Sequence, residues 1–147
     1  MSGGAAAARA APRVTGQLES SLYVADLDRS RAFYEEVFGF ETLLQEDRMV
    51  GLAVPGGSML LLFRRGGSVE ASVMPGGTIP PHDGQGTLHL CFAIPLAELG
   101  TWERHLAAVG VAIESRVTQS FGGQSLYFRD PDGHSLEIAG PGLWATY

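Results

Sequence analysis

The sequence predicts an α+β fold made of two tandem βαβββ modules. Strand and helix patterns in the first half follow this order, and the same order repeats in the second half. A segment rich in glycine and proline separates the two halves. A chain of 147 residues with 45% hydrophobic content is long enough for one domain in which two half-size modules share a core.

The first module is expected over residues 17–64. Apolar and polar residues alternate over 18–24, which is typical of a half-buried strand. Asp28 can cap a helix that runs to about Phe38, and Gly39 can end it. Three further strands are expected at 40–44, 49–54 and 59–63.

The second module is expected over residues 87–139 and begins with a strand at 88–94. A helix follows at roughly 96–109, and Gly110 can end it. The remaining strands are expected at 111–117, 125–129 and 135–138. Asp-Pro-Asp-Gly joins the last two strands, and this sequence is typical of a tight hairpin turn.

Three segments lie outside the modules. Residues 1–16 are expected to form a flexible tail, and residues 140–147 form a second tail at the other end. Residues 65–86 are expected to be a mobile linker loop, because connections longer than about 12–15 residues are usually functional loops or linkers. A role in covering a site is the less favoured interpretation of this loop, and His82 within it is expected to be solvated.

Composition excludes several classes of partner. A net charge of −6 argues against nucleic acid or an anionic membrane surface, since both attract basic faces. No apolar run approaches the ~20 residues that cross a bilayer. Arg9 interrupts the alanines near the start, so no secretion signal is expected there. The single cysteine, Cys91, fits a reducing compartment, and the cytoplasm is the expected location.

The repeat brings chemically active residues into equivalent positions. Glu19 aligns with His89 on the first strands, and Leu61 aligns with Glu137 on the last strands. All four point away from the face that packs on the helices, because side chains alternate along a strand. If the two modules pair edge to edge, these four positions would lie together in one concave site formed by the sheets. Three ligands, a histidine and two glutamates, leave open positions on a metal ion, as catalytic sites require.

Two segments resemble the vicinal oxygen chelate superfamily, also called the glyoxalase, bleomycin-resistance and extradiol-dioxygenase superfamily. These are LYVADLDRSRAFYEEVFGF at 22–40 and LYFRDPDGHSLEI at 126–138. The resemblance implies an incomplete barrel around a divalent metal, with ligands from the first and last strands of the modules. On this chain those ligands would be Glu19, His89 and Glu137, with Leu61 at the fourth position.

Departures from the family pattern leave the reaction open. Extradiol dioxygenases of the superfamily usually use two histidines and one glutamate, whereas glyoxalase I enzymes use four protein ligands and Leu61 removes one here. Tyr127 lies ten residues before Glu137, where ring-cleaving dioxygenases carry an active-site tyrosine. The resemblance therefore favours an extradiol-type dioxygenase marginally over a glyoxalase I-like isomerase or lyase. A metal-free resistance protein that binds drugs or other small molecules is the third alternative.

The predicted site acts on a small, partly apolar molecule through vicinal oxygens. Its predicted catalytic residues are Glu137, Glu19 and Tyr127. Its predicted pocket wall consists of Ser21, Tyr23, Leu61 and Cys91. Oxygen donors suit Fe, Mn, Ni, Zn or Mg without deciding among them. A homodimer is expected, with the site built within one chain or across two.

Overall fold

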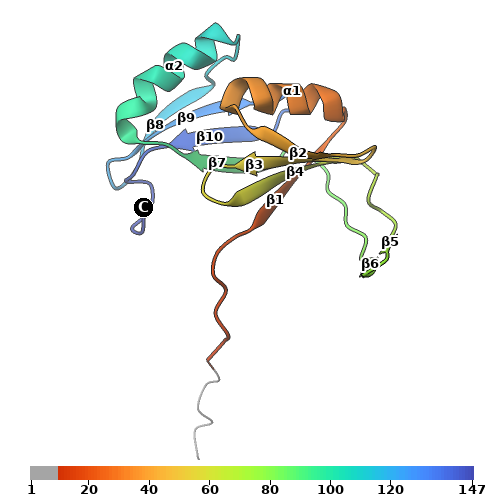
Figure 1. The fold of residues 1–147 in the computed structure, drawn as a ribbon. Helices are drawn as coiled ribbons and strands as arrows, with labels where there is room; N and C mark the ends of the chain where they lie inside the picture. Colours follow the sequence, from red (N-terminus) through yellow and green to blue (C-terminus); the bar gives the residue numbers. More distant parts are fainter. Residues whose placement is uncertain (1–9) are drawn as a thin grey trace, which may run out of the picture.

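The structure is a computed structural model that describes residues 10–147, so part of the predicted tail at 1–16 lies outside it. Both predicted modules are present, and each carries a four-stranded mixed sheet and one α-helix (Figure 1). The two sheets are separate and do not close into a barrel. In the described part of the chain, no helix is long and apolar enough to cross a membrane.

The first module follows the predicted order. Its elements are β1 (Glu19–Val24), α1 (Leu27–Phe38), β2 (Glu41–Gln45), β3 (Met49–Val54) and β4 (Ser58–Arg64). The strand order is β1-β4-β3-β2, with β1 parallel to β4. Asp26 caps α1 instead of Asp28, because the Asp26 backbone is extended and its carboxylate accepts from the Arg29 amide at 3.0 Å. Gly39 ends the helix at φ 67°, as predicted.

The second module repeats this arrangement. Its elements are β7 (His89–Ala93), a 3₁₀ turn η1 (Leu96–Glu98), α2 (Leu99–Ala108), β8 (Ser115–Thr118), β9 (Gln124–Arg129) and β10 (Ser135–Ala139). The strand order is β7-β10-β9-β8, with β7 parallel to β10. The predicted strand at 111–117 begins late, because the Val111 amide still donates to Leu106 at the end of α2.

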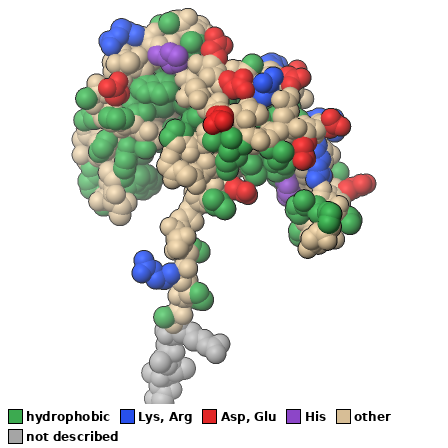
Figure 2. Space-filling model, viewed as in Figure 1, with side chains coloured by type: hydrophobic (Ala, Val, Ile, Leu, Met, Phe, Trp, Pro, Cys, Tyr) green, Lys and Arg blue, Asp and Glu red, His purple; other side chains and the backbone are tan. Residues whose placement is uncertain are grey.

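The linker between the modules contains a hairpin that the sequence patterns did not predict. Strands β5 (Ser72–Met74) and β6 (Gly77–Ile79) form an arm that stands away from the body (Figure 1). Hydrophobic side chains gather on this arm (Figure 2), and Val73 is 85% exposed. Its base is held by a hydrogen bond from the His82 amide to the Ser68 carbonyl at 2.9 Å. Strands of three residues are too short to show a hydrophobic period.

One hydrophobic core serves both modules. Phe38 on α1 reaches across to the second module, with its ring centroid 4.7 Å from that of Phe92 and 5.9 Å from that of Phe128. Leu106 on α2 is fully buried in the same cluster as Leu22 of β1. Both helices lie over the same side of the molecule (Figure 1). The opposite faces of the sheets therefore remain free for a site.

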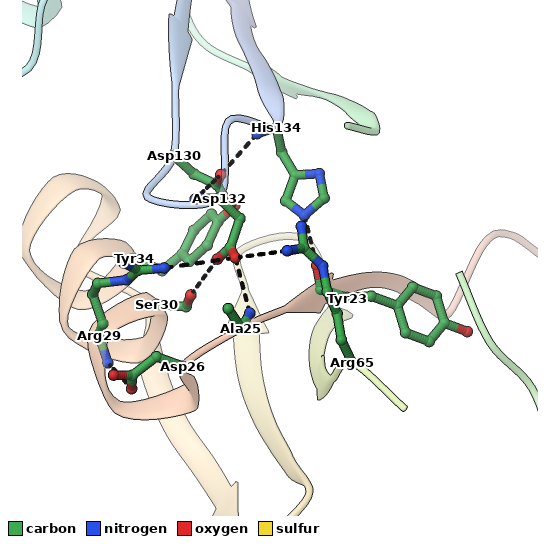
Figure 3. A network of polar contacts seen from close by, with 10 residues as sticks. All are labelled: Tyr23, Ala25, Asp26, Arg29, Ser30, Tyr34, Arg65, Asp130, Asp132 and His134. Carbon is green, nitrogen blue, oxygen red and sulfur yellow. Dashed lines mark hydrogen bonds and ion pairs between the residues drawn. The ribbon is translucent and has the colours of Figure 1, made fainter. Parts of the chain in front are cut away.

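The turn between β9 and β10 docks on the start of α1 (Figure 3). The Asp132 carboxylate accepts hydrogen bonds from the Ala25 amide at 2.8 Å and the Ser30 hydroxyl at 3.2 Å. The guanidinium groups of Arg29 and Arg65 each approach it to 3.6 Å. This carboxylate of the second module therefore holds three parts of the first: the end of β1, the start of α1 and the start of the linker.

His134 and Asp130 continue this junction (Figure 3). His134 is fully buried; its Nε2 donates to the Tyr23 carbonyl at 2.8 Å, and its Nδ1 accepts from the Leu88 amide at 2.9 Å. The Tyr34 hydroxyl donates to Asp130 at 2.9 Å, and burial together with Asp130 raises the pKa of this phenol. His134 thus has a structural role that its place in a turn sequence did not reveal.

Candidate functional site

Glu137 occupies the free face of the second sheet. Its neighbours along β10, Leu136 and Ile138, are fully buried in the core, so the alternation predicted from sequence is confirmed. The pairing of β10 places Glu137 opposite Cys91 on β7 and opposite Tyr127 on β9. Although it faces away from the core, Glu137 is only 3% exposed. A carboxylate this deeply enclosed needs compensation from nearby groups.

The imidazole ring of His89 lies beside that carboxylate. Its Nε2 lies 3.3 Å from Glu137 Oε2, while its Nδ1 lies 2.9 Å from the Ser135 carbonyl. A carbonyl can only accept, so Nδ1 carries a proton and donates. In a neutral ring Nε2 is then an acceptor that faces another acceptor. Metal-binding histidines are commonly oriented in this way by a backbone carbonyl on the other ring nitrogen.

Three further groups surround Glu137. The Gln119 side-chain amide lies 3.4 Å from Oε1. Burial and the Glu137 charge raise the pKa of the Cys91 thiol to about 12. Burial, and less strongly Glu137, also raises the pKa of Tyr127. Cys91 and Tyr127 therefore keep their protons at neutral pH and can donate to the carboxylate. The contacts from His89 at 3.3 Å and from Gln119 at 3.4 Å are longer than the roughly 2.7–2.9 Å of strong charge-assisted bonds.

Glu19 stands at the start of β1 and is exposed. It lines a crevice of about 360 Å³ that His89 and Cys91 also line, so β1 and β7 face each other across it. Within residues 10–147, however, no three His, Cys, Asp or Glu side chains lie close enough together to hold a metal ion. The structure thus unites His89 with Glu137 and leaves Glu19 on the other side of the crevice.

The remaining predicted pocket residues lie on the first sheet. Ser21 and Leu61 are paired neighbours on β1 and β4. Tyr23 is partly buried because the end of the linker covers it: its hydroxyl lies 2.7 Å from His82 Nδ1. A Cβ at Gly84 would overlap the Tyr23 ring. The expectation that His82 is simply solvated was wrong, and this end of the linker covers part of the face.

Gln119 is the site residue that the sequence did not indicate. It lies in the turn between β8 and β9, outside any motif, and reaches Glu137 only through the pairing of β9 with β10. The donor types of the site fit a divalent cation: an imidazole nitrogen and a buried carboxylate oxygen lie 3.3 Å apart, and a second carboxylate, that of Glu19, lines the crevice beside His89.

Comparisons with known proteins identify relatives of this chain. The sequence matches the profile of the Glyoxalase/Bleomycin resistance protein/Dioxygenase superfamily over residues 14–138. It is 29% identical to metallothiol transferase FosB of Bacillus licheniformis over 116 residues, covering 78% of this chain and 68% of the transferase. It is 31% identical to catechol-2,3-dioxygenase of Bacillus subtilis over 123 residues, covering 81% of this chain but only 39% of the dioxygenase.

A solved structure extends the similarity to a third reaction class. Lactoylglutathione lyase from Agrobacterium tumefaciens superposes with a TM-score of 0.83 and 34% identity, covering 91% of this chain and 99% of the lyase. The relatives are thus a transferase, a dioxygenase and a lyase, and the lyase shares the fold described above. The chain belongs to the Glyoxalase/Bleomycin resistance protein/Dioxygenase superfamily.

Proposed function

We propose that this protein is a metal-dependent enzyme that binds a small molecule through two neighbouring oxygen atoms. The contact between His89 Nε2 and Glu137 Oε2 carries this proposal. Because the Ser135 carbonyl occupies Nδ1, Nε2 is the ring nitrogen that faces Glu137 Oε2 at 3.3 Å. An imidazole nitrogen and a carboxylate oxygen are both metal donors, so a cation could bind to the two together.

The proposed ligand set is His89, Glu137 and Glu19. One imidazole and two carboxylates suit Fe(II), Mn, Ni, Zn or Mg. Glu19 would complete the set from this chain or from a second copy, since a homodimer is expected. Three protein ligands would leave positions for substrate, and the bound cation would act as a Lewis acid on the substrate oxygens.

Other residues of the site have proposed roles in binding and proton movement. Tyr127 keeps its proton at neutral pH, since burial raises the pKa of a phenol that is already protonated there, so its hydroxyl can donate to a substrate oxygen. The carboxylate of Glu137 or Glu19 would accept or return a proton. We place Leu61, Ser21, Tyr23 and Cys91 in the pocket wall, with Leu61 as its apolar part; Cys91 lines the crevice beside Glu19 and His89, and Ser21 pairs with Leu61 on the first sheet. A partly apolar substrate fits this wall.

Two reaction classes have specific support. The position of Tyr127 opposite Glu137 favours extradiol-type dioxygenation. The similarity to a lyase over 91% of the chain favours glyoxalase-like isomerase or lyase chemistry. Oxygen uptake by the Fe(II)-loaded protein with a panel of catechols separates them, because only the dioxygenase consumes oxygen. No uptake with any catechol would place the lyase class first.

Metal analysis tests the proposal itself. The purified protein is stripped with a chelator, reloaded with Mn²⁺ or Fe²⁺, and compared with Glu137→Gln and His89→Ala. Both variants should lose most of the bound metal. Glu114→Gln is the matched control, because Glu114 is an exposed carboxylate paired with Arg129. If the two site variants retain as much metal as the parent, the proposal is wrong. The metal-free binding alternative, supported by the separation of Glu19 from the other two residues, then stands.

Mixed dimers show whether Glu19 acts within its own chain. The variants Glu19→Ala and His89→Ala are each expected to bind metal weakly. If the site is shared between chains, a dimer of one variant with the other contains one intact site and recovers half of the parent's binding. If the site lies within one chain, mixing restores nothing.

A further inference from the structure

The amide of Gln119 reaches the base of the proposed metal site. Its Nε2 lies 2.9 Å from the Ser125 hydroxyl, 3.4 Å from the Tyr127 hydroxyl and 3.4 Å from Glu137 Oε1. These partners lie on β9 and β10, whereas Gln119 lies in the turn that precedes β9. A single side chain therefore connects the turn with both strands that carry the site.

The carboxylate determines which end of the amide faces it. An ionised carboxylate only accepts hydrogen bonds, so the amide nitrogen of Gln119 must face Glu137 Oε1. His89 Nε2 approaches the other oxygen, Oε2. The two oxygens of Glu137 thus have separate partners: a neutral donor on Oε1 and the imidazole on Oε2. Because Gln119 occupies Oε1, Oε2 is the oxygen that lies beside the imidazole nitrogen, and these two atoms can bind one cation.

The turn that carries Gln119 is closely tied to the C-terminal segment. The Gly122 amide donates to the Gln119 carbonyl at 2.9 Å, and the Gly123 amide donates to the Gly142 carbonyl at 3.1 Å. A Cβ at Gly123 would lie 2.6 Å from the Gly142 carbonyl carbon, and a Cβ at Gly142 would approach Gly123 even more closely. Only glycine fits at both positions, so the segments are in direct backbone contact.

Tyr147 fixes the C-terminal segment in turn. Its hydroxyl lies 3.2 Å from both the Ile94 carbonyl and the Ala139 carbonyl, to which it donates. These carbonyls follow β7 and end β10, the strands that carry His89 and Glu137. The residues predicted as a tail at 140–147 are therefore bonded to the framework of the site.

We propose that Gln119 is a positioning residue of the metal site and that the C-terminal segment holds it in place. The amide restrains Glu137 so that Oε2 and the His89 nitrogen converge on one cation. Because the amide is neutral, it orients the carboxylate without cancelling the charge that the cation requires. This inference rests on the proposed function.

The test measures Mn²⁺ binding by calorimetry on the stripped protein. Gln119→Met keeps the length of the side chain but removes the donor, and it should raise the dissociation constant about 10–100-fold, as is typical when an outer partner of a ligand is lost. Gln124→Met is the matched control, because Gln124 is an exposed residue of β9. The Mn²⁺ affinity of this variant should equal that of the parent. Tyr147→Phe touches no proposed ligand and should weaken binding to a smaller extent.

A second readout separates positioning from general stability. The visible absorption of the Co²⁺-loaded protein reports ligand geometry, and it should change in Gln119→Met but not in Gln124→Met. If Gln119→Met lowers only the urea midpoint and leaves affinity and spectrum unchanged, the inference is overturned while the metal site remains. A parent protein that binds no Mn²⁺ overturns the proposed function and this inference together. If Gln119→Met does not fold, Tyr147→Phe serves as the test. An unchanged Mn²⁺ affinity in Tyr147→Phe would overturn the proposal that the C-terminal segment holds Gln119 in place.

Discussion

Replacing Asp132 with alanine should weaken the junction between the modules. The side chain of Asp132 is 1% exposed, and it accepts from Ala25 and Ser30 while facing Arg29 and Arg65. Alanine removes the acceptor and leaves the partners in place. The free-energy cost differs between these partners, because the exposed ones can form hydrogen bonds with water instead and the buried one cannot.

The loss in the free energy of unfolding follows from how exposed each partner of Asp132 is. Ser30 is fully buried, so its unpaired hydroxyl costs about 1–3 kcal/mol. The Ala25 amide is exposed, and its lost bond costs about 1 kcal/mol. Arg29 and Arg65 are 51% and 42% exposed, so each ion pair contributes only about 0.2–1 kcal/mol. The free energy of unfolding should fall by about 2.5–6 kcal/mol in total.

Urea unfolding followed by tryptophan fluorescence measures this change. With an m-value of about 2 kcal/mol per molar urea, the midpoint should fall by about 1–3 M. Asp132→Asn keeps the shape and one acceptor oxygen, and it should lose only about 1 kcal/mol. Asp28→Ala is the surface control: the Asp28 side chain is 77% exposed, and its loss should cost less than about 1 kcal/mol. If Asp132→Ala unfolds at the parent's midpoint, the junction does not stabilise the fold and the reasoning fails.

Three further predictions concern separate contacts. The Cys91 thiol should react slowly with iodoacetamide at about pH 8, because its pKa near 12 keeps it protonated, and Glu137→Gln should speed the reaction by lowering that pKa. Tyr34→Phe removes a buried hydrogen bond and should lower the free energy of unfolding by about 1–2 kcal/mol. Gly84→Ala should displace the linker from the Tyr23 ring, seen as faster amide hydrogen exchange near residue 84.

Each of these predictions has a contrary result. Equal alkylation rates in the parent and in Glu137→Gln would show that Glu137 does not control the thiol. An unchanged urea midpoint in Tyr34→Phe would show that the hydroxyl finds an equally good partner elsewhere. Exchange as slow in Gly84→Ala as in the parent would mean that the linker adapts without leaving Tyr23.

Local patterns predicted most of the elements and half of the site geometry. The alternation along 135–138 gave the orientation of Glu137, because opposite faces follow from the covalent geometry of a strand. The internal repeat placed His89 beside it, since equivalent strands occupy equivalent positions in the two sheets. The role of both residues as ligands remains a prediction.

Features that depend on long-range contacts were not predictable in this way. His134 is buried because its turn meets the first module, and its partners Tyr23 and Leu88 are distant in sequence. The hairpin at 72–79 is too short to show a period. Asp26 and Asp28 are equally good capping residues by composition, and only the extended backbone at Asp26 decides between them.

The shared core has a consequence for how the two repeats can exist. Phe38 packs on Phe92 and Phe128 of the other half, so either half expressed alone would expose this aromatic surface to water. Separate halves should therefore aggregate singly and become soluble only when produced together. An ancestor consisting of one such unit would have needed to pair with a second copy of itself, and fusion of the two copies would have made that pairing permanent.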